Sequence, residues 1–295
     1  MDTSFGWLGT GRMGTAMATR MMEARVELAV WNRTAAKCGP LVEAGAIHAV
    51  TLDELAHRDV VLVCVTRSED LIEVLSGEGG LLTHEHRPRV VVDCSTVSAE
   101  ASAQARAAAE ERGAAFLAAP ISGNPDMIRE GAAALVASGP REIFDELHEV
   151  FSAIAPTVVY AGKGEEARLV KICHNLLLGV LAQAYGEVTS LAEKAGVAPE
   201  DFVHFIDGSV LGSPWLRHKG RAIAARDYTP TFSTRNLRKD FDIGVGAARE
   251  HEVPMPLTAS TQQLIQTAIG RGFGEVDYVS LYEVQAASAG LREQA

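Results

Sequence analysis

Lys171 and Asn175 are the residues of this chain whose types and spacing most directly suggest chemistry. They lie four residues apart in a proline-free segment, 165–195, in which apolar residues recur at intervals of three, four and seven. On a helix this spacing puts both side chains on one face. A lysine among apolar neighbours has a lowered pKa and can act as an acid or base near neutral pH, and the amide beside it can hold a substrate hydroxyl or orient the lysine. The same spacing also fits a lysine that snorkels at the helix rim beside a surface asparagine, and His174 is an alternative acid.

A glycine-rich turn near the start of the chain predicts a second kind of chemistry. It follows an apolar strand at 5–8, opens a helix at 13–24, and consists of Gly9, Thr10, Gly11, Arg12, Met13 and Gly14. In a GxGxxG turn, the first glycine permits the tight turn, the second lets the backbone approach a pyrophosphate, and the third lets helix and strand pack closely. The free N–H groups of the helix N-terminus then face the phosphates. A glycine-rich turn without a ligand is the alternative, which the strand–turn–helix context disfavours.

The end of the second expected strand, 27–31, indicates which dinucleotide is bound. A carboxylate there binds the ribose 2′-hydroxyl of NADH, whereas this chain has Asn32, Arg33 and Thr34. A guanidinium and a hydroxyl suit a phosphate, so we predict NADPH rather than NADH. In the alternative interpretation, Thr34 caps the next helix and Arg33 is a solvated charge.

The elements that must position these residues follow an alternating rhythm in the first half of the chain. We expect further strands at 59–65 and 89–93, and helices at 35–42, 69–75 and 98–112, the last with Ser98 as its N-cap. This rhythm predicts a Rossmann-type, doubly wound parallel sheet. Later segments are helical, at 165–195, 199–206, 232–250 and 256–271. We therefore expect a dinucleotide-binding domain at 1–160 and an all-helical domain for substrate binding and oligomerisation at 161–295.

Composition excludes several classes of protein. With 295 residues and a net charge of −11, the chain is a poor partner for nucleic acid or an anionic membrane. Its four cysteines form no CxxC pair, which argues against a metal site. There is no signal peptide and no run of 18 apolar residues, so we expect a cytoplasmic protein without a membrane span.

Four motifs together resemble those of the β-hydroxyacid dehydrogenases, the family that contains 3-hydroxyisobutyrate dehydrogenase, tartronate semialdehyde reductase and, more distantly, 6-phosphogluconate dehydrogenase. In chain order they are the glycine turn with Trp31-Asn32-Arg33-Thr34; Asp93-Cys94-Ser95-Thr96 followed by Ala119-Pro120-Ile121-Ser122-Gly123; Gly162-Lys163-Gly164 running to Lys171 and Asn175; and Lys239-Asp240. The resemblance covers nearly the whole chain.

The resemblance implies roles for further residues. Val65, Thr66 and Thr96 would contact the cofactor, and Ser122, Gly123 and Asn124 would bind the substrate. Lys171 would be the catalytic lysine, Asn175 its substrate-binding neighbour, and Lys239 a second lysine that contacts substrate and cofactor. Three departures from the family pattern stand out: Asn124-Pro125 replaces a glycine that usually follows Ser-Gly, Thr66 replaces a proline, and Asp70 replaces an asparagine.

These observations favour an NADP(H)-dependent oxidoreductase acting on CH–OH groups. It would interconvert a small β-hydroxyacid, or a related alcohol, and its aldehyde or ketone, with Lys171 as general acid and base. The substrate would be a small molecule, expected to carry a carboxylate, and the family resemblance implies a homodimer or homotetramer. Two alternatives remain open: an imine reductase on the same fold, which commonly lacks this lysine, and a non-catalytic NADP-binding regulator.

Overall fold

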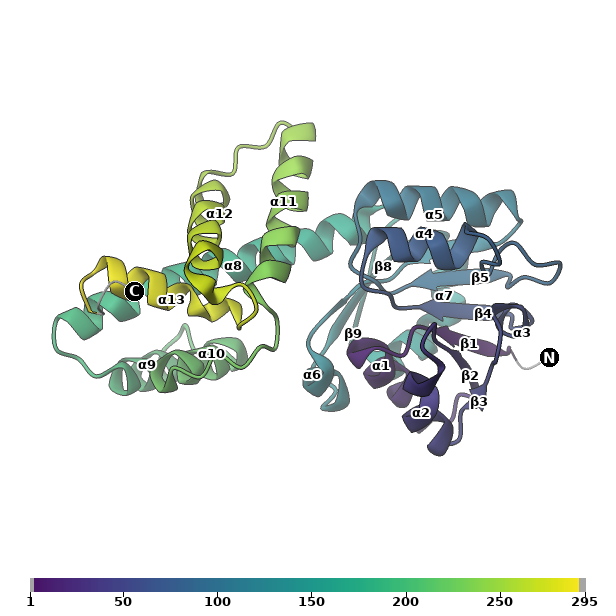
Figure 1. The fold of residues 1–295 in the computed structure, drawn as a ribbon, viewed down its shortest axis with the longest axis horizontal. Coiled ribbons are helices and arrows are strands. Elements are labelled where there is room, and N and C mark those ends of the chain that lie inside the picture. The colour runs from purple at the N-terminus through teal and green to yellow at the C-terminus, as the bar shows by residue number, and fades with distance from the viewer. Residues whose placement is uncertain (1–2, 292–295) are drawn as a thin grey trace. The chain divides into compact units, whose positions relative to one another are not determined.

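The computed structural model describes residues 3–291 and divides into two compact units, Met1–Lys171 and Ile172–Ala295. The first unit is built on one nine-stranded sheet with the order β3-β2-β1-β4-β5-β6-β8-β7, in which β9 also pairs with β8 (Figure 1). Its strands are β1 (Phe5–Leu8), β2 (Leu28–Trp31), β3 (Ile47–His48), β4 (Val60–Val63), β5 (Val90–Asp93), β6 (Ala115–Ala118), β7 (Ile121–Ser122), β8 (Ala134–Ser138) and β9 (Thr157–Gly162). The first six strands in this order, β3-β2-β1-β4-β5-β6, are all parallel. Strand β8 pairs antiparallel with β6 and β7 and parallel with β9.

Helices cover both faces of this sheet. One apolar core joins the sheet to α1 (Arg12–Glu23), α2 (Gly39–Glu43), α6 (Pro125–Arg129) and α7 (Arg141–Ile154). A second core is formed by the strand side chains that point to the opposite face. It joins the sheet to α3 (Leu52–Ala56), α4 (Ser68–Ser76) and α5 (Ala99–Glu111). The central strands β4 and β5 are therefore buried on both faces, which explains their unbroken apolar sequence.

The second unit is helical. Helix α8 (Glu166–Lys194) begins in the first unit and continues into the second, followed by α9 (Pro199–Gly208), α10 (Pro214–Ala225), α11 (Thr234–Glu250), α12 (Pro256–Ala268) and α13 (Leu281–Ser288). Its core includes Ile172 and Leu176 of α8 with Leu237 and Phe241 of α11. The absence of a side chain at Gly179 brings these two helices close, because a Cβ there would lie 2.5 Å from the Phe241 ring.

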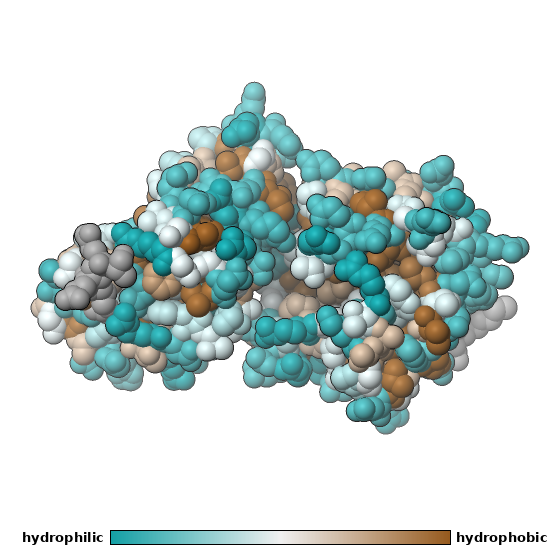
Figure 2. Space-filling model, in the orientation of Figure 1, coloured by the Kyte–Doolittle hydropathy of each residue, from teal (hydrophilic) through white to brown (hydrophobic). Residues whose placement is uncertain are grey.

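Among the helices of residues 3–291, α8 alone is long and apolar enough to cross a membrane by length and composition. Half of its most apolar stretch is buried inside the protein, as in the core helix of a folded domain. The face of the molecule drawn in Figure 2 is mostly hydrophilic, with small apolar groups among the polar residues.

The fold class predicted from the sequence is confirmed. The strands at β1, β2, β4 and β5 and the helices α1, α4, α5, α8, α9, α11 and α12 lie where the patterns predict them, and Ser98 caps α5 by accepting a hydrogen bond from the backbone of Ala101. The helical segment expected at 35–42 is present but divided, since a 3₁₀ helix (Ala35–Cys38) leads directly into the short α2. Thr34 stands at the start of that 3₁₀ helix, but its side chain makes no capping hydrogen bond.

Candidate active site and cofactor site

The glycine turn forms a cradle that side chains would fill. Gly9 has a φ of 98°, and a Cβ there would lie 2.2 Å from the carbonyl oxygen of Cys64. A Cβ at Gly14 would lie 1.9 Å from the carbonyl oxygen of Gly9, so the start of α1 packs directly against the turn. By contrast, nothing lies within 4 Å of the position that a Cβ of Gly11 would take. No side chain caps the N-terminus of α1. Its N–H groups therefore suit an anionic ligand, and the cradle fits the pyrophosphate of a dinucleotide.

Positive charges surround a pocket beside this turn. The pocket has a volume of about 400 Å³ and is lined by Thr10, Gly11, Arg12, Thr15, Ala36, Lys37, Pro40 and Arg129. Arg12 opens α1, Lys37 lies in the 3₁₀ turn after β2, and Arg129 ends α6. Met13, the remaining residue of the turn, is half-buried and packs against the core of the sheet. A chain of net charge −11 thus keeps local positive charge where phosphates would bind.

Asn32 joins the glycine turn to the loop after β2. Its side-chain oxygen accepts a hydrogen bond of 3.0 Å from the backbone N–H of Thr10, and its amide donates one of 3.0 Å to the carbonyl of Thr34. The next residue, Arg33, is not a solitary solvated charge. Its guanidinium lies 3.5 Å from Asp70 and 3.4 Å from Glu73, both on α4.

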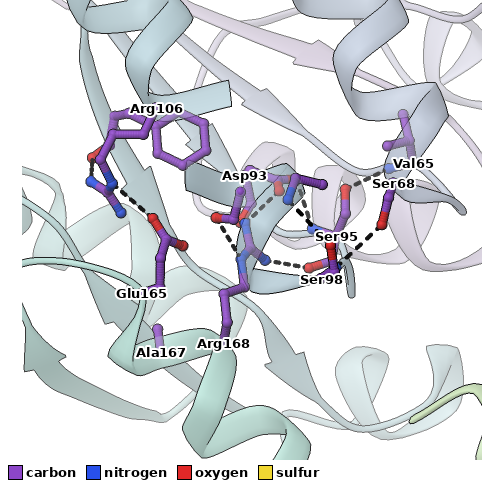
Figure 3. A network of polar contacts seen from close by, with 12 residues as sticks. Val65, Ser68, Asp93, Ser95, Ser98, Arg106, Glu165, Ala167 and Arg168 are labelled. Carbon is purple, nitrogen blue, oxygen red and sulfur yellow. Dashed lines mark hydrogen bonds and ion pairs between the residues drawn. The ribbon is translucent and has the colours of Figure 1, made fainter. Parts of the chain in front are cut away.

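Val65, Thr66 and Thr96 lie just beyond the carboxyl ends of the adjacent strands β4 and β5. The backbone N–H of Val65 donates to the Ser95 hydroxyl at 2.9 Å, and the Ser95 N–H donates to Asp93 at 3.0 Å (Figure 3). Thr66 is exposed and Thr96 is half-buried. The structure therefore places these three residues at the sheet edge where open α/β sheets bind ligands.

A buried ion pair fastens the first turn of α8 to the end of β5. Arg168 and Asp93 are fully buried and form a charge-assisted hydrogen bond (Figure 3). Arg168 also donates to the Ser95 carbonyl and, at 3.0 Å, to the hydroxyl of Ser102. Lys171 follows Arg168 by three residues, so this pair fixes the helix that carries Lys171 relative to the strand end that carries Thr96.

A second arginine strengthens the same connection. Arg106 of α5 donates at 2.8 Å to Glu165, just before α8 (Figure 3). It also donates at 2.7 Å to the carbonyl of Gly164, the residue before Glu165. The Arg106 and Arg168 contacts were not predicted from the sequence. The available signal was one arginine within the Ala-rich helix α5 and another in the first turn of the apolar helix α8.

Lys171 and Asn175 lie one turn apart on α8, as the spacing predicts, and both are buried, at 9% and 4% exposed. Ile172 and Leu176 between and after them are also buried. Asn175 donates a hydrogen bond of 2.6 Å to Asp240 of α11, and its side-chain oxygen lies 2.9 Å from Nδ1 of the exposed His174.

Asp240 also meets Lys239, whose ammonium lies 3.6 Å from its second carboxylate oxygen. The structure thus brings Asn175 and Lys239 to one buried carboxylate, Asp240, to which the Lys239-Asp240 motif alone assigned no role. A carboxylate here fixes the amide of Asn175 so that its oxygen, rather than its N–H₂, points away from Asp240.

The loop after β7 has a local explanation for its unusual sequence. Gly123 adopts a φ of 144°, which favours glycine. Asn124 is the N-cap of α6: its side-chain oxygen accepts a hydrogen bond of 2.9 Å from the backbone N–H of Met127, and Pro125 takes the first helical position. Ser122 precedes them at the end of β7 and is half-buried. Asn124-Pro125 therefore starts a short helix, and the Asn124 side chain is engaged within its own loop.

Known families and structures match the chain over almost its whole length. A family model described as the NAD binding domain of 6-phosphogluconate dehydrogenase matches residues 4–162, and one described as NAD-binding of NADP-dependent 3-hydroxyisobutyrate dehydrogenase matches residues 164–285. The chain belongs to the β-hydroxyacid dehydrogenase family. It is therefore related to pyridine-nucleotide-dependent oxidoreductases that act on CH–OH groups.

Individual members of the family show how far the likeness extends. Glyoxylate/succinic semialdehyde reductase 1 of Arabidopsis thaliana is 26% identical over 94% of this chain and 96% of that protein. The structure of 3-hydroxyisobutyrate dehydrogenase from Salmonella typhimurium superposes with a TM-score of 0.85 at 25% identity, covering 96% of this chain and all of the other. A reductive aminase from Aspergillus terreus, in complex with NADPH and ethyl levulinate, gives a TM-score of 0.60 at 25% identity, covering 96% of this chain and 99% of the other.

Proposed function

We propose that this β-hydroxyacid dehydrogenase uses NADPH to reduce a small aldehyde or keto acid to its hydroxyacid, and catalyses the reverse oxidation. The observation that carries the proposal is the pair Lys171 and Asn175, buried one turn apart on α8, with Asn175 hydrogen-bonded to Asp240. A buried lysine beside a fixed amide suits proton transfer to a carbonyl oxygen. The names of the relatives support a substrate of the semialdehyde or hydroxyacid class.

In this proposal the residues of the chain bind, orient and transfer a proton. A reduced nicotinamide supplies a hydride when it is bound. Lys171 donates its proton to the substrate oxygen during reduction and takes a proton from the hydroxyl during oxidation. Asn175, held by Asp240, orients that oxygen. Backbone N–H groups of Ser122 and Gly123 and the charge of Lys239 bind the substrate carboxylate.

Preference for NADPH over NADH rests on the charges around the cofactor cradle. No carboxylate occupies positions 32–34, where one would repel a 2′-phosphate, and Arg33 lies there instead. Arg12 and Lys37 line the adjacent pocket. The cofactor contacts of Gly9, Thr10, Gly11, Met13, Gly14, Asn32, Thr34, Val65, Thr66, Thr96 and Lys239 belong to the same proposal.

The proposed function extends to the roles of the two domains, the oligomeric state and the cellular location. Residues 1–160 bind the dinucleotide, and residues 161–295 form the helical domain for substrate binding and oligomerisation, in a cytoplasmic homodimer or homotetramer. Exposed apolar side chains at Leu177, Leu181 and Leu191 along α8 support an oligomer.

A second candidate activity is imine reduction, since the chain is similar in structure to a reductive aminase. Lys171 argues against it, because an ammonium that protonates an alkoxide is the group that carbonyl reduction needs. The third candidate is a regulator that binds NADP without turnover. It would give Lys171, Asn175 and Lys239 no catalytic role.

A screen of NADPH consumption separates the three candidates. Purified protein is tested with glyoxylate, succinate semialdehyde, tartronate semialdehyde and methylmalonate semialdehyde, and in parallel with a cyclic imine and with a ketone–amine mixture. We expect turnover of at least one aldehyde acid and none of the imines. Turnover of imines alone supports the reductive aminase assignment, and NADPH binding without any turnover supports the regulator.

A further inference from the structure

We propose that Arg67 is a second ligand for the 2′-phosphate of the cofactor, acting together with Arg33 from the opposite side of the glycine turn. The inference rests on the proposed use of NADPH and deepens it, because it names the residue that completes cofactor discrimination.

The topology brings Arg33 and Arg67 to one edge of the sheet. Arg33 follows the end of β2, and Arg67 is the residue before α4 in the loop after β4. In the sheet, β1 lies between β2 and β4, and all three strands are parallel. The carboxyl ends of these strands therefore meet at the same edge, and the two arginines flank the glycine turn that leaves β1.

Asp70 joins the two side chains directly. Its Oδ1 accepts a hydrogen bond of 2.9 Å from Arg67, and the guanidinium of Arg33 lies 3.5 Å from that same oxygen. The second carboxylate oxygen accepts a bond of 3.0 Å from Nε of Arg67. The hydrogen bonds from Arg67, helped by the charges of Arg67 and Arg33, outweigh the opposing effect of burial and hold the pKa of Asp70 below its usual value, so the carboxyl is charged at neutral pH. The charged Asp70 carboxylate, whose side chain is 11% exposed, thus lies against both guanidinium groups.

Both arginines keep donors for a ligand. Arg67 uses Nε and Nη2 on Asp70, and Arg33 uses Nη1 on Asp70 and Glu73, whereas Nη1 of Arg67 and Nη2 of Arg33 donate no hydrogen bond within residues 3–291. The two side chains are 63% and 62% exposed. Two adjacent guanidinium groups with donors facing solvent match a phosphate dianion, whose oxygens accept from both.

The charges near Arg33 give Arg67 an electrostatic role in this site. Arg33 faces two carboxylates, Asp70 and Glu73, so its own positive charge is balanced before any ligand binds. Arg33 with these two carboxylates carries a net charge of −1, which would repel a 2′-phosphate. Arg67 on the same carboxylate brings the four side chains to neutrality, so its donors and those of Arg33 can bind the phosphate beside the positive charges of Arg12 and Lys37.

Binding of nucleotide fragments tests this inference without catalysis. Adenosine 2′,5′-bisphosphate and 5′-AMP differ only in the 2′-phosphate, and calorimetry gives the affinity of each for the 295-residue chain. We expect Arg67→Met to weaken the bisphosphate by about 10-fold or more and to change 5′-AMP by less than about twofold. Arg67→Lys keeps the charge without the planar fork and should fall between Arg67→Met and wild type.

Arg141→Met is the matched control, because Arg141 is similarly exposed in the same unit and forms its salt bridge with Asp145 of its own helix. It should leave both affinities unchanged. If Arg67→Met weakens both ligands equally, or neither, the role of Arg67 is refuted while an intact wild-type preference for the bisphosphate still supports NADPH. If wild type itself does not prefer the bisphosphate, both this inference and the NADPH assignment are refuted, whereas the aldehyde screen tests the reaction independently.

Discussion

Replacing Asp93 by asparagine should destabilise the first unit strongly, although the two side chains have almost the same shape. The substitution leaves the guanidinium of Arg168 buried at 2% exposure without its counter-charge. Removing one partner of a buried ion pair costs about 3–5 kcal/mol, because the remaining charge stays desolvated and unpaired. Domains of this size unfold with about 5–15 kcal/mol, so the loss is a large fraction of the total.

The free energy of unfolding is best measured in the whole chain with a fluorescence signal that reports on the first unit alone. Trp7 and Trp31 lie in this unit and Trp215 in the other, so a Trp215→Phe background confines the tryptophan signal to the unit that carries Asp93. Urea unfolding followed by this fluorescence should show a loss of about 3–5 kcal/mol for Asp93→Asn. Asp145→Asn is the matched control, since it breaks an exposed pair with Arg141 and should cost less than about 1 kcal/mol.

A second variant separates the pairing from the separate effects of each side chain. Combining Asp93→Asn with Arg168→Met removes both charges, and the double variant should be more stable than the sum of the two single losses predicts. Strict additivity would show that Asp93 and Arg168 do not act as a pair. A loss for Asp93→Asn as small as that of the control would refute the idea that this contact holds α8 to the sheet.

Three further outcomes follow from individual contacts. Gly14→Ala should abolish dinucleotide binding or folding, since its Cβ would lie 1.9 Å from a backbone oxygen, and calorimetry showing normal NADPH affinity would contradict the described turn. Asn124→Ala removes the cap that accepts from Met127 and should cost about 1 kcal/mol of stability by urea unfolding, whereas Asn124→Gly should shift the substrate profile with cofactor affinity unchanged. Burial raises the pKa of the Cys64 thiol to about 12, so iodoacetamide at pH 8 should label the exposed Cys173 and leave Cys64 unmodified by mass spectrometry; equal labelling would show that the thiol is accessible.

The parts of the fold that local rules determine could be predicted from the sequence. The glycine turn, the unbroken apolar strands β4 and β5, and the cap at Ser98 each depend on a few neighbouring residues. The spacing of Lys171 and Asn175 predicted a shared helix face because α8 has no proline and repeats its apolar residues regularly. Burial of both residues agrees with that prediction, and their chemical roles remain proposals.

The contacts that depend on distant residues could not be predicted. Arg168 and Asp93 are 75 residues apart, and Asn175 and Asp240 are 65 apart, so no periodicity links them. The irregular end of the sheet also escaped prediction: β7 has only two residues, and β8 reverses direction against β6. At Asn124-Pro125 the residues favour an N-cap and a first helical turn, which was not predicted, and the contact of this loop with substrate stays a prediction.

The central claim, that Lys171 transfers the proton, is tested most directly by steady-state kinetics of Lys171→Ala with the best substrate from the screen. General acid–base catalysis is worth about 10²–10⁴-fold, so kcat should fall by that factor while the Kd for NADPH, measured by calorimetry, stays unchanged. Lys171→Arg should not restore activity, because a guanidinium does not release its proton near neutral pH. Lys194→Ala, an exposed lysine in the last turn of the same helix, should retain wild-type kcat. A folded Lys171→Ala protein with near wild-type kcat would contradict the account and return His174 or Lys239 as the proton donor.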